Sequence, residues 1–135
     1  MTLSVINPFD QRVYRELPFD TAASLEKKIR AAKTAAGKWR MVPLTERVAA
    51  VRSGLDYFRT HRDAIAADIT AQMGKPITES RNEIKGLFER AEHMLAIAEE
   101  SLAPEILPPK DDLYRRIERE PLGVVLNIAA WNYPL

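Results

Sequence analysis

The sequence contains no cysteine and only two histidines. A chain without thiols can form no disulfide and no thiolate zinc site, and it carries no cysteine nucleophile. Neither His61 nor His93 has a second histidine or a carboxylate at a spacing typical of a metal site. We therefore expect no metal in this chain, and we expect a cytoplasmic location because disulfides are rare there.

An excess of charge is also missing. The chain has 20 Lys and Arg residues and 19 Asp and Glu residues, so its formal net charge is +1. A nucleic-acid or anionic-membrane surface needs a net basic patch, yet even the charged segment 110–120 balances basic and acidic side chains. No stretch approaches the roughly 20 apolar residues that span a bilayer, and the N-terminus does not resemble a signal peptide. We expect neither nucleic acid nor a membrane as a partner.

Glycine is scarce, with 5 residues in the chain. No two of them lie close enough to form a loop that cradles phosphate. Lys75 follows Gly74, but the preceding glycine and the following Ser or Thr of a P-loop are absent. The sequence therefore contains no self-contained phosphate site.

Helical periodicity is the main positive feature of the sequence. Apolar residues recur at the three- and four-residue spacing of one buried helix face. This spacing predicts helices over residues 21–36, over residues 43–74 with a break at 61–62, and over residues 78–102. Asp20 and Asp63 are candidate N-caps, and Gly37 and Gly74 are candidate helix stops.

Short strands are expected at both ends of the helical region. The turn Asn7-Pro8-Phe9-Asp10 predicts a surface hairpin whose second strand covers residues 12–17. The prolines that follow residue 102 predict a loop, and a partly exposed strand is expected over residues 113–119. Residues 122–128 form a continuous run rich in branched side chains, which is typical of a parallel strand covered on both faces. Such a strand needs a partner strand and a crossover, and this chain supplies neither.

The predicted buried strand leads into Trp131-Asn132-Tyr133-Pro134. Open α/β sheets bind their ligands at the carboxyl ends of their strands. The side-chain amide of Asn132 can donate a hydrogen bond to a developing oxyanion, although a loop asparagine with a purely structural role has the same sequence pattern. Trp131 offers a flat apolar surface, as a core tryptophan also does.

The stretch EPLGVVLNIAAWNYPL, residues 120–135, resembles the first cofactor-domain strand of NAD(P)-dependent aldehyde dehydrogenases. INPFDQRVY is similar to the opening turn of that family, and the segment from AAGKW through the Gly-Lys-Pro turn to ESRNEI is similar to its early helices. The resemblance covers residues 6–135. It departs from the family pattern at Ala130, where the family commonly has proline.

The resemblance implies an α/β fold in which an N-terminal helical shell precedes the first strands of a Rossmann-like cofactor domain. Residues 1–109 would form the N-terminal hairpin and helices of that domain. Residues 110–121 would lead to the oligomerisation hairpin, and residues 122–135 would be the incomplete first strand of the cofactor-binding sheet. We therefore expect the chain to be the N-terminal segment of a larger enzyme.

The resemblance also assigns roles to single residues. Asn132 matches the catalytic asparagine whose amide helps to stabilise an oxyanion, and Ile128, Ala129, Ala130 and Trp131 match the strand end that lines the NAD or NADP site. Gly74, Lys75, Pro76 and Glu83 match positions of structural importance. The family's nucleophilic cysteine and general-base glutamate have no counterpart here, so we expect the isolated chain to be inactive.

Two other interpretations stay open at this point. The chain could be a non-enzymatic interaction module whose strand 113–119 pairs with full-length aldehyde dehydrogenase subunits. It could also be an unrelated helical adaptor, in which case the terminal motif is a coincidence. Within the family reading, the expected partners are an aldehyde substrate and further subunits in a homo-oligomer.

Overall fold

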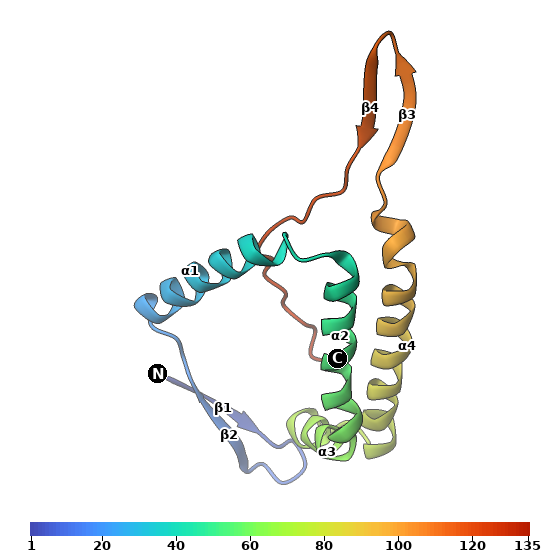
Figure 1. Cartoon of the computed structure of the whole chain (residues 1–135). Coiled ribbons are helices and arrows are strands. Elements are labelled where there is room, and N and C mark those ends of the chain that lie inside the picture. The colour runs from blue at the N-terminus through green and yellow to red at the C-terminus, as the bar shows by residue number, and fades with distance from the viewer.

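A computed structural model describes all residues, 1–135. Four helices stand between two hairpins, and the last residues form an irregular segment (Figure 1). In chain order the elements are β1 (Thr2–Ile6), β2 (Val13–Pro18), α1 (Ala22–Trp39), α2 (Leu44–Thr60), α3 (Arg62–Met73), α4 (Ile77–Leu102), β3 (Glu105–Lys110) and β4 (Leu113–Ile117).

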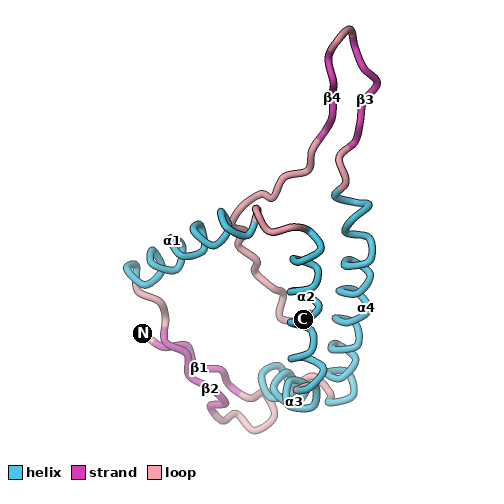
Figure 2. Tube along the Cα trace, in the orientation of Figure 1, coloured by secondary structure: helices cyan, strands magenta, loops and turns pink.

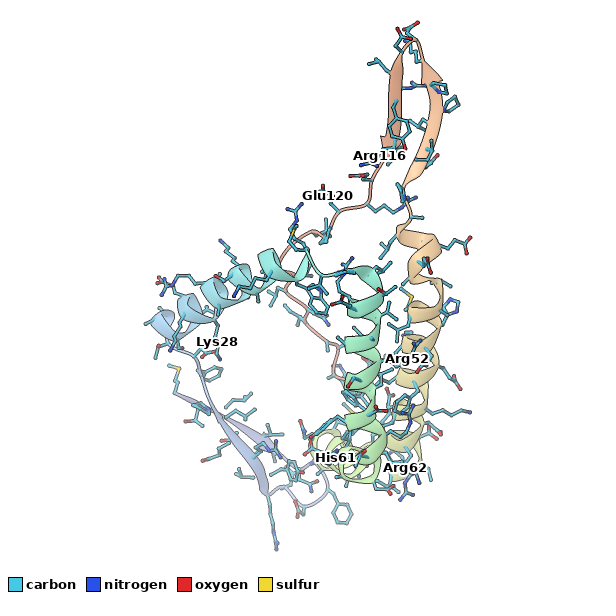
Figure 3. The ribbon with its side chains drawn as sticks, in the orientation of Figure 1. Lys28, Arg52, His61, Arg62, Arg116 and Glu120 are labelled. Carbon is cyan, nitrogen blue, oxygen red and sulfur yellow. The ribbon has the colours of Figure 1, made fainter.

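The core of the molecule lies among α2, α3 and α4. The helices α2 and α4 run side by side and α3 closes one end of the pair (Figure 1). The buried apolar side chains all belong to these helices: Leu55, Ala66, Ile69 and Ile84. The hydroxyls of Thr70 and Ser80 share a hydrogen bond of 2.9 Å across the α3–α4 turn. Arg52 of α2 (labelled in Figure 3) pairs with Glu92 of α4 at 3.4 Å.

The helix boundaries confirm most of the sequence pattern. The predicted break between α2 and α3 is present, and α3 ends at Gly74, which adopts the left-handed conformation with φ 72°. The prediction that Asp63 caps α3 is wrong, because His61 occupies the N-cap without a side-chain hydrogen bond. Asp63 instead accepts a hydrogen bond from Arg81 of α4 at 3.3 Å.

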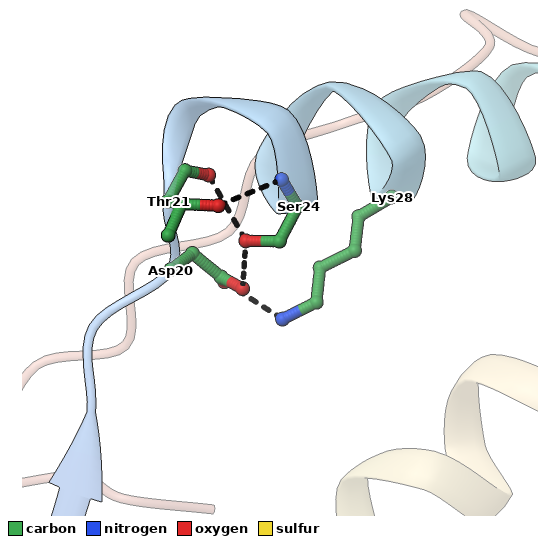
Figure 4. Close-up of polar contacts among 4 residues, drawn as sticks. All are labelled: Asp20, Thr21, Ser24 and Lys28. Atoms are coloured by element: carbon green, nitrogen blue, oxygen red, sulfur yellow. Dashed lines mark hydrogen bonds and ion pairs between the residues drawn. The ribbon is translucent and has the colours of Figure 1, made fainter.

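Two expectations for α1 are also wrong. Thr21, not Asp20, is the N-cap: its hydroxyl oxygen accepts a hydrogen bond of 3.1 Å from the backbone N–H of Ser24 (Figure 4). Asp20 accepts hydrogen bonds from the Ser24 hydroxyl and from Lys28. Gly37 does not stop the helix, which continues to Trp39, since an isolated glycine can take helical dihedrals at a modest cost.

The first hairpin confirms the predicted turn. The side chain of Asn7 accepts from the backbone N–H of Phe9 at 2.9 Å, and that of Asp10 accepts from Arg12 at 3.1 Å, so both residues fold the turn locally. The strands β1 and β2 pair antiparallel with an irregularity after Val5. Tyr14 donates its hydroxyl to Asp68 at 2.6 Å, which ties the hairpin to α3.

The second hairpin corrects the expectation of a proline loop. Pro108 and Pro109 lie within β3, which pairs antiparallel with β4. The pairing register shifts between Leu107 and Lys110, and such an irregularity accommodates residues that cannot donate to a ladder. The hairpin projects beyond the helices, away from the rest of the molecule (Figure 1).

The predicted buried strand over residues 122–128 is not a strand in this structure. Residues 118–135 form neither helix nor strand, and they run back past α1 toward α2 (Figure 2). Leu122 is 95% exposed and Leu126 is 84% exposed. A strand needs a neighbour to accept and donate its backbone hydrogen bonds, and both two-stranded sheets lie elsewhere. The continuous apolar run of residues 122–128 therefore forms no strand pairing here.

No helix of the structure combines the length and the hydrophobicity required to cross a membrane. The cytoplasmic location stays a prediction.

Candidate functional site

The residues singled out in the sequence lie together on the last turn of the chain. The backbone N–H of Tyr133 donates to the carbonyl of Ala130 at 3.2 Å, so Trp131 and Asn132 occupy the two central positions of a turn. Ile128 and Ala129 precede this turn directly. The structure thus presents the predicted site residues as one contiguous stretch.

All five predicted site residues are exposed. The side chains of Ile128 and Trp131 are 83% and 78% exposed, and no other part of the chain buries this apolar surface. The side-chain amide of Asn132 takes part in no hydrogen bond, so both of its N–H groups are available to a ligand. The oxyanion role of Asn132 and the cofactor role of residues 128–131 stay predictions.

One lysine side chain fastens the turn to the helices. Lys75 Nζ donates to the backbone carbonyl of Asn132 at 3.3 Å, and the same Nζ lies 5.9 Å from the centroid of the Tyr133 ring. Lys75 also forms an ion pair with Glu83. The carbonyl of Asn132 is therefore held while its side chain stays free.

Lys75 owes its position to the turn between α3 and α4. Gly74 ends α3 in the left-handed region and Pro76 is the N-cap of α4, so Lys75 stands on a backbone fixed at both sides. Glu83 lies on the second turn of α4 and meets the lysine there. With side-chain exposures of 22% and 12%, this is the least exposed ion pair of the molecule.

Tyr133 and Leu135 rest on α4. They line a groove of about 360 Å³ together with residues of that helix, among them Glu83, Gly86 and Leu87. Gly86 leaves open space at this face, where a Cβ would meet no atom within 4 Å. The groove is occupied at one side by the end of the chain itself, so it belongs to the packing of the turn.

From the sequence, Lys75 and Glu83 were expected to have a structural role only. The spacing of eight residues, with a glycine stop directly before the lysine and a proline start directly after it, was the one available signal that these charges could meet. Nothing in the sequence indicates the contact with Asn132, which lies 57 positions away. The turn that holds the predicted oxyanion donor is recognised only from the structure.

Two titratable groups have pKa values shifted from their ordinary ones, and both lie away from the Asn132 turn. The hydrogen bond from Tyr14 to Asp68 raises the pKa of the tyrosine above 10.0. The hydrogen bond from Lys28 lowers the pKa of Asp20 below 3.8, and the Ser24 hydroxyl adds to this effect (Figure 4). Neither shift points to catalysis, because each stabilises a local joint of the fold.

The structure contains no group of three or more metal-ligating side chains. The imidazole of His61 stacks on the ring of Tyr57 with centroids 4.2 Å apart, and its Nδ1 lies 2.9 Å from the Tyr57 carbonyl oxygen. This histidine therefore serves the junction between α2 and α3 (Figure 3).

Several known proteins are similar to this chain in sequence and fold. Curated relatives include an acylating methylmalonate-semialdehyde dehydrogenase from Arabidopsis thaliana mitochondria, 30% identical over 98% of this chain. Another is the NADP(+) succinate-semialdehyde dehydrogenase of Deinococcus radiodurans, 29% identical over 98% of this chain. The chain spans only 22% and 28% of the length of these two relatives.

Solved structures of longer proteins are also similar to this chain. Betaine aldehyde dehydrogenase from Staphylococcus aureus, determined in complex with NAD+, is 31% identical and superposes with a TM-score of 0.89 over 99% of this chain and 28% of its own. The structure of Gox0499 gives a TM-score of 0.90 at 26% identity, with 29% of that chain covered. The helical shell seen here is thus the arrangement found in the N-terminal region of these enzymes.

The profile of the aldehyde dehydrogenase family matches residues 1–135. Because this match extends from the first hairpin through the helices to the Asn132 turn, the chain belongs to the aldehyde dehydrogenase family.

Proposed function

We propose that this chain serves as the N-terminal part of an NAD(P)-dependent aldehyde dehydrogenase that oxidises an aldehyde to a carboxylic acid. Within that enzyme, Asn132 donates a hydrogen bond to the oxyanion, and residues 128–131 form one wall of the cofactor site. The family match over the whole chain is the observation that carries the proposal.

The geometry of Asn132 suits an oxyanion donor. Its backbone carbonyl is engaged by Lys75 at 3.3 Å, whereas its side-chain amide makes no hydrogen bond. A donor whose backbone is held in place before the charge develops needs less reorganisation during the reaction. Loss of one such donor typically costs about 3 kcal/mol of transition-state stabilisation.

The residues present fit one wall of a nicotinamide cofactor site. Ile128 and Trp131 expose apolar surface that an aromatic ring can cover. The stretch 128–131 carries no basic side chain and no glycine pair for the phosphates, so it does not form a complete site. When bound, the cofactor accepts the hydride. We assign NAD or NADP, in keeping with the NAD+ and NADP(+) named for two relatives.

The isolated chain is expected to be inactive, because it has no cysteine to attack the aldehyde. Purified residues 1–135, supplied with aldehyde and NAD+ or NADP+, should produce reduced cofactor no faster than a control without protein. Turnover clearly above that control contradicts this part of the proposal.

The role of Asn132 is tested in an active background. In the S. aureus betaine aldehyde dehydrogenase, the region that matches this chain is replaced by residues 1–135. Asn132→Ala is then introduced into this chimera. We expect kcat to fall by about 10²-fold, as for other oxyanion donors. Asn82→Ala, at an exposed position of α4, is the matched control and should leave kcat unchanged. Equal activity of both variants refutes the assignment.

One observation favours a second function, that of an interaction module. The β3–β4 hairpin projects from the helices (Figure 1), and β4 pairs on one side only. Pro108 and Pro109 remove backbone donors from β3, so β4 offers the more complete edge for an added strand of another subunit. Homo-oligomers or assemblies with full-length subunits would form through this edge.

A pull-down with full-length subunits of the family tests the module. Residues 1–135 and residues 1–120, which both keep the hairpin, should be recovered alike, whereas residues 1–109 should be lost. Equal recovery of all three versions contradicts the role of β4.

A further inference from the structure

The geometry points to Lys75 as a positioning residue that, braced by Glu83, holds the turn of Asn132 through its backbone carbonyl. This inference rests on the proposed role of Asn132 as an oxyanion donor. It assigns to the Gly-Lys-Pro turn a function in the site beyond the packing of α3 against α4.

The first observation is that the contact stands alone. Residues 121–135 make a single hydrogen bond to the rest of the chain, and that bond is the one from Lys75 Nζ to the Asn132 carbonyl at 3.3 Å. The other hydrogen bond of the segment, from Tyr133 to Ala130, is internal. Without Lys75 the turn keeps its local shape but loses its only polar connection to the helices.

The second observation is that the lysine is itself held. Most ion pairs of this molecule join exposed side chains, and such pairs have little influence on the position of their members. Glu83 and Lys75 are 12% and 22% exposed. Burial of this degree strengthens the attraction and restricts both side chains, so the ammonium is held near the Asn132 carbonyl.

The third observation is the rigidity of the platform. Gly74 lies against Pro8, and the buried Ser80 shares a hydrogen bond with Thr70. The position of Nζ is therefore set by a turn braced from the first hairpin and from α4. An ammonium 5.9 Å from the Tyr133 ring adds a cation–π attraction to the residue after Asn132.

At Asn132 the backbone and the side chain have different roles. The lysine binds the carbonyl, and the amide that would reach an oxyanion stays unbound. The observed arrangement holds the backbone of Asn132 and leaves its side-chain amide free to donate.

The test measures order in the turn of the 135-residue chain, not turnover. Backbone ¹⁵N order parameters are recorded for residues 130–133, with the amides of α4 as an internal reference. In the unaltered chain we expect values for the turn near the rigid limit of about 0.85, and in Lys75→Met below about 0.6. Lys75→Arg keeps the charge and the donors, so it should restore order. Lys85→Met, which removes an exposed lysine of α4, is the matched control.

A second variant separates positioning from stability. Lys75→Met alone leaves Glu83 partly buried and unpaired, which can loosen α4. Lys75→Met combined with Glu83→Gln removes both charges, so the order parameters of α4 should return to their original values while those of residues 130–133 stay low. If the turn regains its order in the double variant, or never loses it in Lys75→Met, the inference is wrong. Neither result depends on whether Asn132 takes part in aldehyde oxidation.

Discussion

Replacement of Gly74 by alanine tests the joint on which the candidate site stands. Gly74 has φ +72°, and a Cβ built on it would lie 2.9 Å from Pro8 Cγ and 3.6 Å from Pro8 Cβ. The left-handed conformation costs a residue with a Cβ about 1–2 kcal/mol. The contact with Pro8 adds about 1 kcal/mol, as overpacking typically does. We therefore expect Gly74→Ala to destabilise the α3–α4 unit by about 2–3 kcal/mol.

Two further variants divide this cost into its parts. Pro8→Ala removes the Cγ atom, so in that background Gly74→Ala should cost only the conformational part, about 1–2 kcal/mol. Gly54 lies within α2, and a Cβ there meets no atom within 4 Å. Gly54→Ala should therefore stabilise the chain by up to about 1 kcal/mol, as expected for an exposed helix interior.

Native-state hydrogen exchange is the suitable assay, because it reports the free energy of opening for each helix separately. The amides of α3 and α4 are compared between the variants, with the N–H of Gly74, which donates to the Thr70 carbonyl at 2.8 Å, as the local probe. If Gly74→Ala opens α3 and α4 no more easily than Gly54→Ala does, the left-handed turn against Pro8 is refuted. The inference that this turn fixes the position of Lys75 is then refuted as well.

Other joints of the fold give further predictions. Thr21→Ala removes the cap of α1 and should destabilise that helix by about 1 kcal/mol, whereas Thr21→Ser should not; circular dichroism measures the loss of helix. The pKa of Asp20 is lowered, so its contribution to stability is present above pH 3.8 and lost as the pH falls further, and Asp20→Asn should abolish this acid dependence in urea titrations. The pKa of Tyr14 is raised, so its contribution is present below pH 10.0 and lost as the pH rises beyond it. Tyr14→Phe should flatten that alkaline decline, and an unchanged pH profile would contradict the bond to Asp68.

Sequence periodicity predicted the helices well because their apolar faces follow local spacing. The break before α3 and the stop at Gly74 appear as expected, and both depend on residues adjacent in the chain. The caps were less predictable. Asp20 and Thr21 are both good N-cap residues, and the choice between them depends on which one stands immediately before the helical backbone.

The errors concern contacts between distant segments. Residues 122–128 have the composition of a covered strand, but a strand forms only against another strand, and no paired edge of this chain lies beside them. Pro108 and Pro109 suggested a loop, and the irregular register of β3 accommodates them instead. The contact between Lys75 and Asn132 joins positions that share no local pattern. Asn132 was singled out by the resemblance of the sequence, and its oxyanion role stays a prediction, whereas its contact with Lys75 was not expected.

The position of α1 has a consequence for experiments on the whole chain. This helix has no buried residue, and it diverges from α2 and α4 (Figure 1). The ion pair between Arg40 and Glu120, at 3.4 Å, joins two exposed side chains near the end of α1 and restrains the helix little. Heating should therefore melt α1 before the compact unit of α2, α3 and α4. A calorimetric trace of this chain is then a composite of separate transitions, and no single melting temperature describes the molecule.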